Sequence, residues 1–177
     1  MGTFAQTQLI PANELSPGGA SSIRNGVMRS LLGQASKDLP MIEEKLVVRD
    51  IRPLSDLDYT IESWGEVTGA TANTYETMST GTLADRRFLA IYGVKLSKES
   101  MGSCSAIRIT IGGSLKAIWV TEGLSKIDDY IGFCPSGIII PQNTIYTIER
   151  YVIMTTSPFN CILKGLIVEP RGKVVSP

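Results

Sequence analysis

From residue 41 to its C-terminus the chain consists of short strand-like segments separated by turn residues, and this pattern limits the fold more than any other feature. The clearest segment is 106–111, where three isoleucines alternate with other residues. An alternation with a period of two indicates a strand that has one face on a hydrophobic core. Gly112-Gly113 follows directly, and two glycines between two such segments predict a tight hairpin turn. The side chains expected to face inward are Ile107, Ile109 and Ile111.

Similar segments recur about every 8–15 residues across this region, and helical periodicity is essentially missing from it. They cover residues 45–51, 58–64, 87–96, 106–111, 115–121, 144–154 and 161–168, and two shorter strands are expected within 128–140 around Cys134-Pro135. In 87–96 one face is expected to carry Phe88, Ala90, Tyr92, Val94 and Leu96. The polar stretch 65–83 is expected to be an exposed loop with a short strand or helical turn. Regular short strands predict an all-β sandwich or barrel. The length and strand count favour an eight-stranded jelly-roll-like β-sandwich whose body spans 41–177.

Residues 1–40 lack this pattern and are expected to form an N-terminal arm. The first twenty contain two prolines and a Gly-Gly pair, and no period persists in them, which predicts an extended segment. One short helix is predicted near 21–36, where Ile23, Val27 and Leu31 form an apolar stripe. Two glycines within it each cost about 1 kcal/mol relative to alanine. The helix therefore needs a surface to lie on, either its own body or a neighbouring molecule.

The charges of the chain balance, with 17 Lys and Arg residues against 17 Asp and Glu residues. The first fifty residues are balanced as well, with five of each sign. We therefore expect neither nucleic acid nor a membrane surface as a partner. No apolar run approaches the ~20 residues of a membrane-spanning helix, and the first residues show no secretory or myristoylation pattern. We expect the protein to be made in a cytoplasm.

The chain contains no histidine, which removes the commonest general base and the usual zinc, iron and copper ligand sets. Its three cysteines, Cys104, Cys134 and Cys161, are far apart in the sequence and lie in or beside apolar runs. Buried free thiols are the favoured interpretation, and a bridge between two of them stays open. We expect no enzyme activity, no cofactor and no metal site.

Two groups of charged residues allow a functional interpretation beside a plainer one. Asp128-Asp129 and Glu122 offer oxygen ligands to calcium, but their loop lacks an alternating Asp/Asn ladder, so solvated turn residues are favoured. Glu149 and Arg150 lie on opposite faces of a long apolar strand, so one of them points toward a core or a subunit contact. A charge in such a place must be paired, which predicts a structural ion pair.

Arginines and aromatic residues offer two further candidates. Asp85, Arg86 and Arg87 mark the entry to a strand, where a surface salt bridge is expected in preference to a clamp for a carboxylate or phosphate. Trp64 and Trp119 could stack on a sugar as in β-sandwich lectins, but core and interface packing is favoured for such rings. The tyrosines considered with them are Tyr59, Tyr75 and Tyr92.

The C-terminal half, from about residue 115 to 177, contains a Pro-Gln-Asn-Thr-Ile-Tyr turn at 141–146, a last strand Ile-Leu-Lys-Gly-Leu-Ile-Val-Glu-Pro at 162–170 and a short polar tail at 171–177. In these features it resembles the jelly-roll or β-sandwich structural proteins of tailed phages and related viruses. It implies a structural virion protein, in particular a capsid decoration (cement) protein that stabilises the shell through its N-terminal arm and subunit contacts. The implied partners are the major capsid or another assembly protein and further copies of this chain, a trimer being one form.

Because the arm is neutral, it is expected to hold protein through apolar side chains. These partner-binding anchors are Phe4, Leu9, Ile10, Leu15, Ile23, Val27 and Leu31. The alternative function is a carbohydrate- or receptor-binding β-sandwich module of a viral spike or fibre. In that case an exposed tryptophan is expected to contact the ligand.

Overall fold

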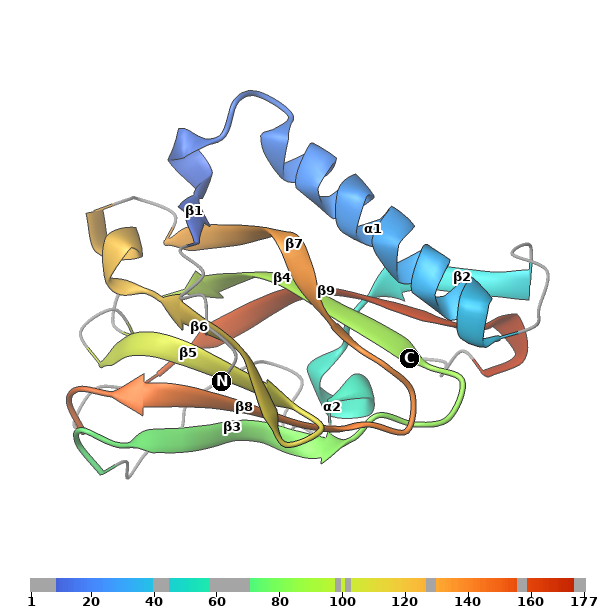
Figure 1. Cartoon of the computed structure of the whole chain (residues 1–177). Coiled ribbons are helices and arrows are strands. Elements are labelled where there is room, and N and C mark those ends of the chain that lie inside the picture. Colours follow the sequence, from blue (N-terminus) through green and yellow to red (C-terminus); the bar gives the residue numbers. More distant parts are fainter. Residues whose placement is uncertain are drawn as a thin grey trace.

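The protein is a β-sandwich of two antiparallel sheets with one long helix on the outside of one sheet (Figure 1). It is represented by a computed structural model that describes residues 9–39, 45–57, 71–97, 100, 103–126, 130–155 and 159–173. The described strands are β1 (Ile10–Pro11), β2 (Leu46–Asp50), β3 (Tyr75–Thr82), β4 (Phe88–Leu96), β5 (Cys104–Ile111), β6 (Ser114–Val120), β7 (Ile131–Ile140), β8 (Ile145–Val152) and β9 (Cys161–Pro170). The described helices are α1 (Gly19–Asp38), α2 (Pro53–Asp56) and the 3-10 turns η1 (Ala12–Glu14), η4 (Glu122–Lys126) and η5 (Arg171–Lys173).

Most of the predicted strands are confirmed within a few residues. The predicted segments 45–51, 87–96, 106–111, 115–121, 144–154 and 161–168 correspond to β2, β4, β5, β6, β8 and β9. The predicted segment 58–64 lies outside the described residues. The stretch 65–83, expected to be an exposed loop with a short strand or helical turn, contains the eight-residue strand β3. Gly112 and Gly113 have φ angles of 57° and 74°, as the tight turn between β5 and β6 requires.

The strands pair in a nested order. The first sheet has the order β1-β7-β4-β9-β2 and the second has the order β3-β8-β5-β6. Consequently β2 pairs with β9, β3 with β8, β4 with β7 and β5 with β6, all antiparallel. Most partners in this series are far apart in the sequence, so the sandwich depends on long-range contacts.

The main core fills the space between the two sheets. Trp119, Tyr146 and Phe159 are its largest buried aromatic side chains. The three isoleucines of β5 point into it as predicted, and all three are buried. Fully burying a side chain of this size contributes about 1.5–3 kcal/mol. The core between the sheets contains more buried apolar side chains than the cluster between α1 and the five-stranded sheet, so it makes the larger apolar contribution.

Helix α1 covers the outer face of the five-stranded sheet, where it lies on β7, β4 and β9 (Figure 1). The helix predicted at 21–36 is confirmed and is longer, beginning at Gly19 after a left-handed Gly18 with φ of 81°. Val27 and Leu31 are buried against the sheet. Their burial contributes about 3–6 kcal/mol together and exceeds the roughly 2 kcal/mol cost of the two internal glycines. The surface that the helix needs is therefore the body of its own chain.

This packing corrects the predicted division at residue 40. Residues 9–39 form a strand, a 3-10 turn and a helix that all contact the sandwich, so they belong to its body. An extended arm is not observed from residue 9 onward, because β1 pairs with β7 and the apolar stripe of α1 has a sheet to cover. The arm prediction now concerns only residues 1–8, which lie outside the described residues.

A β-bulge in the middle of the five-stranded sheet corrects two further predictions. In β4 the register advances from Ile91 to Gly93 while β9 advances by a single residue, so Tyr92 is an extra residue. A one-residue slip moves the following side chains to the other face. The first three residues of the predicted face, Phe88, Ala90 and Tyr92, therefore face α1, whereas Val94 and Leu96 face the core between the sheets. The two strands predicted within 128–140 are one strand, β7, with residues 134–137 bulged opposite Tyr92.

Candidate functional site

The structure places most of the predicted partner-binding anchors inside the molecule. Leu9, Val27 and Leu31 are buried. Leu9 lies in the core between the sheets, and the other two point from α1 onto the five-stranded sheet. They are not accessible to a partner, which corrects their assignment, because this chain's own sheet satisfies their apolar surface. The half-buried anchors are Ile10, which pairs with Phe133, and Leu15 and Ile23, which pack against the cluster beneath α1. Phe4 lies outside the described residues.

The aromatic residues considered for a sugar platform are not gathered on one surface. Trp119 is buried in the main core and Tyr92 is buried beneath α1, which confirms core packing for these two rings. Tyr59 and Trp64 lie outside the described residues. Only Tyr75 of the considered set is known to reach solvent, and it does so on the outer face of the four-stranded sheet.

Tyr75 belongs to an ordered group on that outer face, formed with Arg108, Glu149 and Tyr151, which we call the tyrosine face. The rings of Tyr75 and its cross-strand neighbour Tyr151 meet edge to face with centroids 5.1 Å apart. The Arg108 guanidinium lies 3.8 Å above the Tyr75 ring and donates two hydrogen bonds, of 2.6 and 2.7 Å, to Glu149. These bonds to Glu149 raise the pKa of Arg108.

The tyrosine face is suited to binding because its side chains are already held in place. Cross-strand aromatic and ion-pair contacts fix their rotamers, so less conformational entropy is lost when a partner docks. Tyrosine and arginine are also the residue types that contribute most to binding energy at protein interfaces. Helix α1 lies on the other sheet, so it does not pack on this face (Figure 1).

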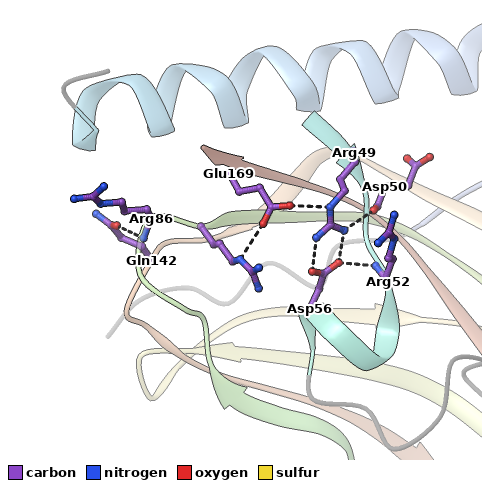
Figure 2. Close-up of polar contacts among 8 residues, drawn as sticks. Arg49, Asp50, Arg52, Asp56, Arg86, Gln142 and Glu169 are labelled. Carbon is purple, nitrogen blue, oxygen red and sulfur yellow. Dashed lines mark hydrogen bonds and ion pairs between the residues drawn. The ribbon is translucent and has the colours of Figure 1, made fainter. Parts of the chain in front are cut away.

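A buried ionic cluster lies at one end of the sandwich, formed by Arg49, Asp56, Arg87 and Glu169, which we call the Arg49 cluster (Figure 2). Arg49 donates two hydrogen bonds of 2.6 and 2.7 Å to Asp56 and a third of 2.8 Å to Glu169. Arg87 lies 2.9 Å from the other oxygen of Glu169. Both carboxyl side chains are fully buried. Hydrogen bonding to Asp56 is the main cause that raises the pKa of Arg49, against the opposing effect of burial.

The Arg49 cluster has a structural role. It joins β2, β9 and α2 to the residue that precedes β4, and the backbone N–H of Arg52 donates a 2.7 Å bond to Asp56. Arg87 also makes a salt bridge, but a surface location was predicted and is wrong for this residue, because its partner Glu169 is fully buried. Arg86 lies 3.6 Å from Asp85 at the surface, and its backbone N–H donates to Gln142 (Figure 2).

The predicted ion pair at Glu149 and Arg150 is confirmed as two separate pairs. Glu149 faces outward to Arg108, whereas Arg150 is only 2% exposed and lies 2.9 Å from Glu76. The Arg150 guanidinium also lies 4.4 Å from the centroid of the Phe159 ring. A cation in the core is thus paired with a carboxylate and stacked on an aromatic ring, as a buried charge requires.

The three cysteines are buried free thiols, in agreement with the favoured interpretation. Burial raises the pKa of Cys104 from 9.0 to about 11. The pKa of Cys161 is also raised, mainly by burial and then by Cys104. Because the thiolate is the reactive form, these two groups are held in their unreactive state.

A cleft of about 290 Å³ opens between α1 and the strands β2, β4 and β9. At its mouth Arg24 lies 3.2 Å from Asp50. Burial and the charge of Asp50 raise the pKa of Tyr92, while the charge and hydrogen bond of Arg24 oppose this. The lining residues are Arg24, Asp50, Ile51, Tyr92, Ile162, Leu163, Lys164 and Gly165. Sequence reasoning missed this cleft because its residues come from four separate elements; the lysine inside the apolar run of β9 was its only sequence signal.

Of the carboxylates considered for calcium, Glu122 is exposed in η4. Asp128 and Asp129 lie outside the described residues. Within the described ranges, no three His, Cys, Asp or Glu residues form a group that could hold a metal ion. Nor does any helix among the residues described have the length and apolar character to cross a membrane. No family model and no curated protein matches the sequence.

Proposed function

We propose that this chain is a structural virion protein, a capsid decoration (cement) protein that acts by binding and has no catalytic role. The nested strand pairing is the single observation that carries the proposal. In the series β2·β9, β3·β8, β4·β7 and β5·β6, each pair lies inside the preceding one along the chain. A long antiparallel ribbon that is folded across two sheets produces this order, and it is the arrangement of a double-sheet jelly roll.

The proposed jelly-roll order also accommodates the strands that carry the sequence resemblance. The strands that carry the sequence resemblance, β8 and β9, occupy inner positions in their sheets, β8 between β3 and β5 and β9 between β4 and β2. Double-sheet jelly rolls are characteristic of viral capsid proteins and lectins. Fold alone does not determine function, so the proposal also needs a surface that binds.

The tyrosine face supplies that surface. It presents Tyr75, Tyr151 and Arg108 from three adjacent strands, on the outer face of the four-stranded sheet. We propose that it contacts the major capsid protein or another assembly protein, or a further copy of this chain in a homo-oligomer such as a trimer. A protein that binds only the assembled shell stabilises it by mass action, by about 2.7 kcal/mol per site at a hundredfold excess over Kd.

The experiment is to remove the tyrosine face and measure docking onto the particle with which the chain sediments. Tyr151→Ala and Arg108→Met are each expected to raise the Kd of docking at least tenfold, because tyrosine and arginine at the centre of an interface contribute 2 kcal/mol or more. Lys37→Ala, an exposed substitution at the end of α1, is the matched control. An unchanged Kd in both face variants, with melting curves that show a folded protein, would overturn the proposal.

The N-terminal segment is tested separately. Deleting residues 1–8 removes Phe4 and leaves the described body complete, and we expect docking to weaken while thermal stability is unchanged. Deleting residues 1–36, by contrast, exposes the apolar sheet beneath α1 and is expected to destabilise the protein. If the chain without residues 1–8 docks as well as the full chain, the N-terminal segment does not take part in docking.

The second candidate is a carbohydrate- or receptor-binding module, and the solvent-facing Tyr75–Tyr151 pair is the observation in its favour. Trp119 is excluded from such a site because it is buried in the core. Glycan-array binding that is lost in Tyr151→Ala, with the fold retained, would favour this candidate over a capsid contact.

A further inference from the structure

The cleft between α1 and the five-stranded sheet combines one net positive charge with apolar walls. Arg24 and Lys164 contribute two cations and Asp50 one carboxylate. Of its three apolar lining residues, Ile162 is 50% exposed, whereas Leu163 belongs to the core between the sheets and Ile51 packs against that core. A site of this composition is complementary to an anion carried by an aliphatic group.

Both cations are available to a ligand. The pair of Arg24 and Asp50 has a separation of 3.2 Å and side-chain exposures of 40% and 72%. Exposed pairs of this kind contribute at most about 1 kcal/mol, so Arg24 can exchange Asp50 for another carboxylate. Lys164 has no ion pair with any residue that the structure describes.

The β-bulge gives the cleft its neutral hydrogen-bond donor. Tyr92 is the extra residue of β4, and bulges commonly re-aim a side chain beside a binding site. A tyrosine phenol keeps its proton at neutral pH, since its ordinary pKa is about 10, and burial raises the pKa of Tyr92 further. A protonated phenol donates a hydrogen bond to a carboxylate, whereas a phenolate repels it.

The size of the cleft limits what it can hold. A volume of about 290 Å³ lies at the lower end of the range for small-ligand sites, which suits a single residue. Within that space the cations and the apolar side chains are close together, and Ile162 is 50% exposed at the cleft. An aliphatic C-terminal residue carries both complementary groups on one unit, whereas an acidic side chain has no aliphatic branch of its own.

We propose that this cleft binds the C-terminal carboxylate of an aliphatic residue presented by the assembly partner of the protein. In the bound state Arg24 and Lys164 hold the carboxylate, the Tyr92 hydroxyl donates to it, and the aliphatic side chain covers Ile162. Capture of a chain terminus is a known mode of peptide recognition. The inference rests on the proposed function, because that function requires a polypeptide partner.

The test is an NMR titration of the full chain, labelled with ¹⁵N, with N-acetyl-L-leucine as the probe and the uncharged N-acetyl-L-leucinamide as its control. Saturable shifts are expected at the amides of Tyr92, Lys164 and Gly165 with the acid only. Lys164→Met keeps the aliphatic stem and is expected to raise Kd about tenfold, the effect of losing one hydrogen bond to a charged group. Lys116→Met, on an exposed position of β6 in the other sheet, is expected to leave Kd unchanged.

Three outcomes would overturn the proposal: no saturable shift at these amides, equal shifts with the amide probe, or an unchanged Kd in Lys164→Met. The titration uses the free protein, so it is separate from the docking assay. Loss of docking with an intact titration counts against the proposed function. An absent titration with intact docking counts against the cleft alone.

Discussion

Glu169→Gln is the substitution that most directly tests the physical account of the fold. Glu169 is fully buried, with one carboxylate oxygen 2.8 Å from Arg49 and the other 2.9 Å from Arg87. Glutamine has nearly the same shape, so the substitution removes the charge with little change in packing. The two arginine side chains, each 13% exposed, then lose their shared counter-charge.

The magnitude follows from the burial of the pair. Removing one partner of a buried ion pair costs about 3–5 kcal/mol, because the remaining charge is left uncompensated. Arg49 keeps Asp56 and both arginines reach some solvent, so we place the loss of unfolding free energy at the lower end, about 3 kcal/mol. With a urea m-value of about 1–3 kcal/mol/M, the midpoint falls by roughly 1–3 M.

The assay is equilibrium urea unfolding, with Glu14→Gln as the control. Glu14 is exposed in η1, and its substitution is expected to stay within about 0.5 kcal/mol of the parent. The double variant Glu169→Gln with Arg87→Met is expected to lose about 1 kcal/mol less than the sum of its two single changes. A loss below about 1 kcal/mol for Glu169→Gln, or strict additivity in the double variant, would refute the reasoning.

Three further predictions concern the helix, the thiols and the hairpin. Leu31→Ala should lower the unfolding free energy by about 2–5 kcal/mol in urea titrations, since this side chain is fully buried beneath α1; a loss below 1 kcal/mol would mean that the helix is not docked. Between pH 9.0 and about 11 the unfolded chain loses the Cys104 proton and the folded chain keeps it, so stability falls by up to about 2.7 kcal/mol as pH rises. Cys104→Ala should flatten that part of the stability profile, and an identical profile would contradict the raised pKa. Gly113→Val should cost at least about 1 kcal/mol in calorimetry because φ is 74° there, whereas an unchanged melting temperature would exclude the left-handed turn.

Local patterns predicted the strands well because their information lies within a few residues. The alternation in 106–111 and the following Gly-Gly pair indicate a strand and its turn without reference to the rest of the chain. The stripe containing Val27 and Leu31 likewise indicated a helix that needs a surface. The stripe did not reveal which molecule supplies that surface, because the sheet on which the helix packs forms from strands about 50 to 140 residues further along the chain.

The remaining features depend on pairings that are distant in sequence. Tyr92 looks like a member of a regular alternating face, and only the register of β4 against β9 shows that it is an extra residue. Glu169 meets Arg49 across 120 residues, so no local spacing reports the contact. The cleft beside Lys164 depends on a register shift and on distant pairings, because it forms only where the bulge of β4 lies next to α1, β2 and β9.

The central claim is that the chain works as a component of a large assembly, and sedimentation of the native protein tests it most directly. Lysate or particle preparations from the producing cells are resolved on a density gradient, and the 19.2 kDa chain is located by quantitative mass spectrometry. The account predicts that most of the chain sediments with a megadalton particle at a fixed ratio to its main subunit, and that Tyr151→Ala leaves the particle fraction. A native chain found only as a free monomer or small oligomer, in preparations where such particles are present, would contradict the account.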